Sequence, residues 1–133
     1  GWNAVYPKAS KSTRHTVEAM QHFTGPEDTI KKFYCDGAPE LTAGTRHCTW
    51  RIVTATTEMP QTDGVAERAV RAVQEGGRCE IRQSGCSPAW WPIAPEHMCF
   101  SKVIADADGD SPYNKRLGKD EFKGERTSCG ALI

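Results

Sequence analysis

The sequence contains no apolar run close to the roughly 20 residues that a membrane-spanning helix needs, and no signal peptide is recognisable in it. It has no excess of charge of either sign, because 17 basic residues balance 17 acidic ones. No overall positive field therefore favours a nucleic-acid partner, and any contact with nucleic acid must come from a local basic patch. Internal repeats and low-complexity tracts are also missing. For 133 residues, 38% of them apolar, a single domain with a modest core is expected.

Cysteine pairs with metal-binding spacing are lacking as well. The six cysteines are dispersed and form no C-x-x-C motif. His47-Cys48 and His97-x-Cys99 have neither the spacing of a zinc finger nor that of a zinc knuckle, so zinc binding is not expected from them. Reduced thiols in an intracellular protein are the expectation. The cysteines are Cys35, Cys48, Cys79, Cys86, Cys99 and Cys129.

Strand patterns alternate with helix patterns along the chain, which favours an α/β layer fold. β-branched and aromatic residues predict strands at 2–7, 30–35 and 51–56. A flexible loop is predicted at 57–64, and the chain is expected to be polar and irregular after residue 105.

Helix boundaries are indicated by capping residues and prolines. The first helix begins after Ser10 or Ser12 and is stopped by Gly25-Pro26. The others are predicted at 39–50 with Pro39 at its first position, at 65–83, and from Ser87-Pro88 onward with a start distorted by Pro92 and Pro95.

Two carboxylates stand where such a fold can bring them together. Asp36 follows the strand at 30–35, and functional groups gather at the carboxyl ends of strands in α/β sheets. Glu67 stands on the first turn of the predicted helix at 65–83, where the helix dipole favours a carboxylate. Paired carboxylates of this kind bind the divalent metals of phosphoryl-transfer sites. The structural alternatives are that Asp36 caps the next helix and that Glu67 forms a surface ion pair with Arg71.

The helix at 65–83 has two distinct faces. One is a stripe of small apolar groups suited to close packing on a sheet, made of Val65, Ala69, Ala72, Val73 and Gly76. The other carries a row of polar residues that can bind the phosphates flanking a reacting bond. An ordinary charged surface is the alternative. This row is Glu67, Arg71, Gln74, Arg78 and Arg82.

A motif of the form PQ-x-(N/D)-G-x-x-E-R joins the predicted loop to this helix, as Pro60-Gln61-Thr62-Asp63-Gly64-Val65-Ala66-Glu67-Arg68. Together with the strand that ends in Asp36, it resembles the catalytic core of retrotransposon and retroviral integrases, most closely those of copia-like elements. The family usually has Asp-Asn where this chain has Asp36-Gly37.

The resemblance implies a partial ribonuclease-H-like fold and, for the intact protein, strand transfer of DNA that depends on Mg²⁺ or Mn²⁺. It implies that Asp36 and Glu67 are catalytic metal ligands and that Gln61, on a mobile loop, helps to place DNA. Arg71, Gln74, Arg78 and Arg82 complete the predicted DNA contacts. A homo-oligomer in the nucleus is implied for the intact protein.

Further segments fit the same family. Trp90-Trp91-Pro92 matches its W-W-P element and is predicted to pack in the core. The segment 111–118 resembles the stretch that follows the integrase core. The acidic run at 106–110 has the wrong glycine position for a calcium loop and is interpreted as a simple loop.

The resemblance covers nearly the whole chain, yet the family uses three carboxylates, and the strand that carries the first would lie upstream of residue 2. We therefore expect a fragment, truncated at both ends and without the first two strands, with a partial core at 1–105 and a polar extension at 106–133. The rival interpretation is a catalytically dead remnant that at most binds nucleic acid through Arg71, Arg78 and Arg82.

Overall fold

The computed structural model describes residues 2–54, 60–105 and 109–131, and of residues 60–63 it describes the backbone alone. The described chain is a mixture of helices and short strands, as expected for the α/β class. It divides into two compact units, one formed by Lys8–Glu67 and the other by Gly1–Pro7 together with Arg68–Ile133. The predicted boundary near residue 105 stays a prediction.

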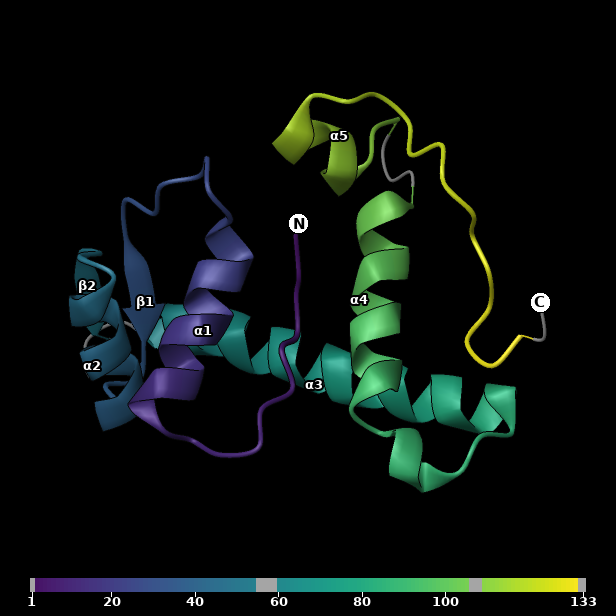
Figure 1. Ribbon diagram of the computed structural model, residues 1–133, viewed down its shortest axis with the longest axis horizontal. Coiled ribbons are helices and arrows are strands. Elements are labelled where there is room, and N and C mark those ends of the chain that lie inside the picture. Colours follow the sequence, from purple (N-terminus) through teal and green to yellow (C-terminus); the bar gives the residue numbers. More distant parts are fainter. Residues whose placement is uncertain (1, 55–59, 106–108, 132–133) are drawn as a thin grey trace. The chain divides into compact units, whose positions relative to one another are not determined.

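The unit Lys8–Glu67 is built around a parallel two-stranded sheet. Strand β1 (Phe33–Cys35) and strand β2 (Ile52–Thr54) pair in register, Phe33 opposite Ile52 and Cys35 opposite Thr54. Helix α2 (Pro39–His47) connects them, as a parallel pair requires, and helix α1 (Thr13–Thr24) packs against α2 (Figure 1). Both strands lie inside the predicted ranges but are shorter than predicted.

Helix α1 begins and ends at the residues that its sequence indicates. The Ser12 hydroxyl accepts a hydrogen bond from the His15 backbone N–H at 3.3 Å, and Gly25 ends the helix with φ of 63°. Val17 and Met20 are the buried residues of α1. Gly44 of α2 faces this side, because a Cβ there would lie 3.2 Å from the Met20 sulfur. This glycine therefore permits close packing of α2 on α1.

The strand predicted at 2–7 is wrong, because these residues have no regular structure. A strand needs a hydrogen-bonding neighbour, and the described sheet consists of β1 and β2 only. Trp2 instead lies against a cation, with the Arg116 guanidinium 4.5 Å from the centre of its ring.

The second unit contains several helices, the first of which, α3 (Pro60–Ser84), begins in the other unit and enters this one at Arg68. Helix α3 is followed by a 3₁₀ turn, Pro88–Trp90, and by α4 (Ile93–Ile104), which packs on α3 (Figure 1). Helix α5 (Pro112–Leu117) packs against α4. The 3₁₀ turn is the distorted start that the prolines predict. The buried apolar residues of α4 are Ala94, Met98, Cys99, Val103 and Ile104.

Three details of this part correct the sequence analysis. Helix α3 begins at Pro60 and not at 65, so the predicted loop is helical from 60 to 64. Its start fits a proline at the first helical position, which needs no backbone N–H and has its φ preset. The segment after 105 is not wholly irregular, since Ser111 caps α5 and Gly118 ends it with φ of 63°. Trp90 and Trp91, predicted to be core residues, are 56% and 41% exposed.

The helices of the described chain include none that is both long and apolar enough to span a bilayer.

All six cysteines are free thiols. Of the apolar stripe predicted to pack on the sheet, Val65 is 60% exposed and Gly76 faces Met98 of α4, and packing of the stripe on the sheet stays a prediction.

Candidate functional site

Asp36 comes directly after β1 and is exposed. Its Oδ1 atom accepts a hydrogen bond from the Ala38 backbone N–H at 3.1 Å. This bond closes a turn ahead of α2 and does not cap the helix, because the N-cap residue is Ala38, which has no side-chain cap. The carboxylate is therefore held at the strand end, and no described residue bonds its second oxygen, which stays open to a ligand.

The register of the sheet determines which end of β2 lies beside Asp36. Cys35 pairs with Thr54, the last residue of β2, so both strands end at the same edge. Ligand sites of parallel sheets form at this carboxyl edge. The chain leaves β2 there and continues through 55–59, outside the described residues, into α3.

Glu67 lies on α3 and is exposed. Because α3 begins at Pro60, Glu67 stands about two turns inside the helix, so its predicted place on the first turn is wrong. The helix dipole acts mainly within the first turn and does little for it. Among the described ion pairs there is none between Glu67 and Arg71, so the surface-pair alternative is not realised. The approach of Glu67 to Asp36 stays a prediction.

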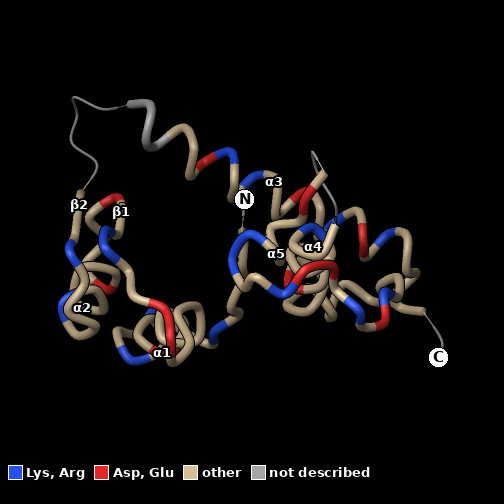
Figure 2. Tube along the Cα trace, turned by 90° about the horizontal axis from the view of Figure 1, so that it is seen from above, with Lys and Arg blue, Asp and Glu red and all other residues tan. Residues whose placement is uncertain are grey.

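The predicted DNA-binding row is exposed wherever its side chains are described. Figure 2 shows basic residues recurring along α3, and Arg71, Gln74, Arg78 and Arg82 are all exposed. None of the three arginines takes part in a described ion pair, which leaves their guanidinium groups open to phosphate. Gln61 lies in the first turns of α3, and its side chain is outside the described residues.

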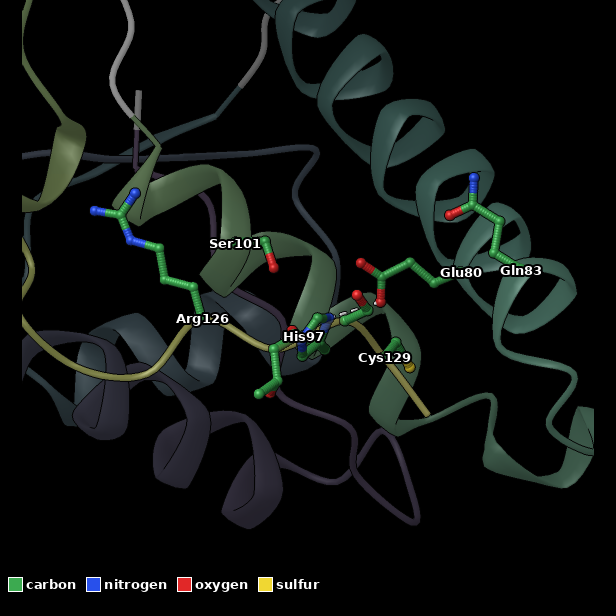
Figure 3. Close-up of a pocket in the computed structure, with 8 residues that line it drawn as sticks. Glu80, Gln83, His97, Ser101, Arg126 and Cys129 are labelled. Carbon is green, nitrogen blue, oxygen red and sulfur yellow. Dashed lines mark hydrogen bonds and ion pairs between the residues drawn. The ribbon is translucent and has the colours of Figure 1, made fainter. Parts of the chain in front are cut away.

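A second polar cluster, which the sequence analysis missed, lies within the unit that contains α4 and the part of α3 from Arg68 onward. Glu80 of α3, His97 of α4 and Cys129 line a cavity of about 480 Å³ (Figure 3). His97 Nδ1 lies 2.9 Å from Glu80 Oε2, and His97 Nε2 lies 3.0 Å from the Thr127 carbonyl oxygen. The nitrogen, oxygen and sulfur ligand atoms of the three side chains all lie within 4.8 Å of one another.

Burial and the nearby Glu80 carboxylate raise the pKa of the Cys129 thiol. The sequence analysis considered His97 only together with Cys99, two residues further on, and expected no zinc site there; Cys99 is buried with 2% of its surface exposed. No short spacing joins His97 to Cys129, so no motif could have indicated this cluster.

A comparison of the chain with protein-family models, curated proteins and solved structures finds no match. The predicted roles of Asp36, Glu67 and the basic row therefore stay predictions from the sequence motif.

Proposed function

We propose that this chain is part of a metal-dependent DNA-processing core of the integrase type, in which Asp36 and Glu67 are ligands of a divalent metal. One observation carries the proposal: Asp36 stands at the carboxyl edge of the parallel β1–α2–β2 unit, from which β2 leads on to the helix of Glu67. The integrase-like motif requires this order of strand, aspartate, helix, strand and glutamate. The ribonuclease-H-like fold is part of the same proposal.

The donor set fits magnesium. Both side chains offer exposed carboxylate oxygens, which are the hard ligands that Mg²⁺ and Mn²⁺ prefer. A metal bound there would polarise a phosphodiester and stabilise the charge that develops on it. The family uses three carboxylates, of which this chain supplies the two that match its motif. Asp36 and Glu67 would hold the metal, and the hydrogen bond from Ala38 would keep Asp36 turned along the strand edge.

The exposed side of α3 would bind the DNA. Arg71, Arg78 and Arg82 follow Glu67 on one side of the helix and would contact phosphates on either side of the reacting bond. Gln74 would add a polar contact to the DNA backbone, and Gln61 would help to place the DNA end. Assembly of the intact protein as a homo-oligomer on DNA in the nucleus belongs to this proposal.

The test uses a longer chain that also carries the first of the family's three carboxylates, which would lie upstream of residue 2. Glu67→Gln keeps the size of the side chain but removes the charge that holds metal, so strand transfer should fall at least 100-fold while DNA affinity changes less than about twofold. Glu75→Gln, an exposed carboxylate on the same helix, is the matched control and should leave both properties unchanged. Normal turnover in Glu67→Gln would refute the proposed role of this helix.

A catalytically dead remnant that binds nucleic acid remains the second candidate. The exposed arginines of α3, which have no described ion-pair partner, favour it as much as they favour the enzyme. The two candidates differ in metal binding, since a remnant has no need of a shared metal at Asp36 and Glu67.

A further inference from the structure

The cluster of Glu80, His97 and Cys129 has the chemistry of a transition-metal site. We propose that these three side chains bind one Zn²⁺ ion. The proposal is independent of the integrase-like function, because the three residues belong to α3, α4 and the C-terminal segment and include neither Asp36 nor Glu67.

The hydrogen bonds of His97 show which ring nitrogen is free for a metal. Nε2 faces the Thr127 carbonyl oxygen at 3.0 Å, and since a carbonyl oxygen can only accept, Nε2 carries the hydrogen and donates it. In the neutral imidazole Nδ1 then has a lone pair, and this lone pair points at Glu80 Oε2, 2.9 Å away. A metal-binding histidine commonly donates its other N–H to a backbone carbonyl in this way.

Two hydrogen-bond acceptors such as Nδ1 and Glu80 Oε2, 2.9 Å apart, repel each other unless a proton or a metal ion lies between them. A proton on Nδ1 would give a simple His–Glu ion pair. The third member of the cluster argues for a metal, because Cys129 brings a sulfur within 4.8 Å of both other ligand atoms. Zn²⁺ binds sulfur, nitrogen and oxygen ligands together, and the Cys129 thiol would lose its proton on binding it.

The distances are within reach of a tetrahedral zinc site. Zinc bonds of about 2.0–2.3 Å place neighbouring ligand atoms roughly 3.3–3.7 Å apart. The observed separations, from 2.9 Å to at most 4.8 Å, therefore require side-chain shifts of about an ångström. Cys129 can supply such a shift, because the described chain after α5 has no helix or strand.

The surroundings leave room for a fourth ligand. The cavity is also lined by the polar side chains of Gln83 and Ser101, as Figure 3 shows, and a water molecule there would complete the coordination. All three proposed ligands are partly buried, which shields the metal bonds from solvent without closing the cavity. Because the ligands come from α3, α4 and the C-terminal segment, zinc would fix this segment to the two helices.

Cobalt substitution of the reduced, metal-free 133-residue chain tests the site. Co²⁺ should bind in a one-to-one ratio, with the intense visible absorption of tetrahedral cobalt and a near-ultraviolet charge-transfer band from the thiolate, and one equivalent of Zn²⁺ should remove both. Cys129→Ser should abolish the charge-transfer band. Glu80→Gln and His97→Ala should weaken Zn²⁺ binding at least 100-fold in competition with a chromophoric chelator.

Two controls separate this site from adventitious binding. Cys79→Ser removes an exposed thiol beside Glu80 in the sequence, and Glu75→Gln removes an exposed carboxylate of the same helix. Both variants should bind Co²⁺ and Zn²⁺ as the unaltered chain does. The proposal is overturned if the unaltered chain gives no tetrahedral cobalt spectrum, if Cys129→Ser keeps the charge-transfer band, or if Cys79→Ser loses it.

Discussion

The adjacent glycines Gly76 and Gly77 of α3 pack closely against α4. A Cβ at Gly77 would lie 2.7 Å from the Pro95 ring, and a Cβ at Gly76 would lie 2.9 Å from the flexible Met98 side chain. Replacing a helical glycine with alanine normally favours the helix by about 1 kcal/mol. Overpacking a close contact costs about 1–3 kcal/mol, and the rigid proline ring cannot move aside as methionine can. The cost of overpacking should therefore exceed the gain in helix propensity at Gly77, whereas the two should more nearly cancel at Gly76.

Gly77→Ala is expected to lower the free energy of unfolding by about 1–2 kcal/mol, measured by urea denaturation. Gly76→Ala is the matched comparison and should lower the free energy of unfolding clearly less than Gly77→Ala, because Met98 can change rotamer. Equal stability of Gly77→Ala and the unaltered chain would show that the close contact with Pro95 is not formed.

The cysteines should differ in their reactivity toward a thiol reagent. Burial raises the pKa of the Cys99 thiol, which is 2% exposed, whereas Cys79 is exposed on α3. Since the thiolate is the nucleophile, Cys99 is expected to react at least 100-fold more slowly than Cys79 near neutral pH. Comparing the single variants Cys79→Ser and Cys99→Ser in a colorimetric thiol assay measures this. Loss of the fast-reacting phase in Cys99→Ser would contradict the burial of the Cys99 thiol in α4.

At the scale of helices and strands, local signals predicted both ends of α1 and the start of α2, but neither the end of α2 nor the start of α3. Ser12, Gly25 and Pro39 mark ends of α1 and α2 because capping depends on neighbouring residues alone. The strand predicted at 2–7 is wrong because strand formation depends on a partner that the local sequence does not specify. The Trp90-Trp91 pair was misplaced for a related reason. Prolines on both sides confine Trp90 to a 3₁₀ turn and keep the pair outside α4.

The basic row of α3 leads to a prediction for DNA binding by the whole chain. Arg78→Ala combined with Arg82→Ala should weaken binding and lower the log–log salt slope by about two units, since each lost phosphate contact removes about one. Binding is measured by fluorescence anisotropy over a series of salt concentrations.

The matched control for this pair is Lys31→Ala with Lys32→Ala, which removes the same charge from exposed positions before β1. If the control lowered the slope as much as the arginine variant did, binding would reflect net charge and not the exposed side of α3.

At the scale of the whole molecule, a local motif in the sequence was enough to propose Asp36 and Glu67, and the site that they would share stays a prediction. The cluster of Glu80, His97 and Cys129 could not be found, since it depends on how α4 and the C-terminal segment meet α3. The residues predicted to bind DNA lie on α3, but this helix begins earlier than predicted, because Pro60 can begin a helix as well as end a loop.

The 133-residue chain should not join DNA ends on its own in Mg²⁺ or Mn²⁺. Under the proposed mechanism it would supply two of the three carboxylates, so the metals would lack part of their ligand set and the charge of the reacting phosphate would not be offset. A strand-transfer assay with labelled DNA ends measures this. Efficient joining by the purified chain would contradict the proposed mechanism.

The central claim, a divalent metal shared by Asp36 and Glu67, can be tested directly by paramagnetic broadening. Substoichiometric Mn²⁺ added to the ¹⁵N-labelled chain should broaden the amide signals of Gly37 and of Ala66 and Arg68 together, because Mn²⁺ prefers carboxylate oxygens. Asp36→Asn should remove the broadening at both places, while Glu27→Gln, an exposed carboxylate elsewhere in the same unit, should leave it unchanged. Broadening at Glu67 that persists in Asp36→Asn would contradict the shared metal.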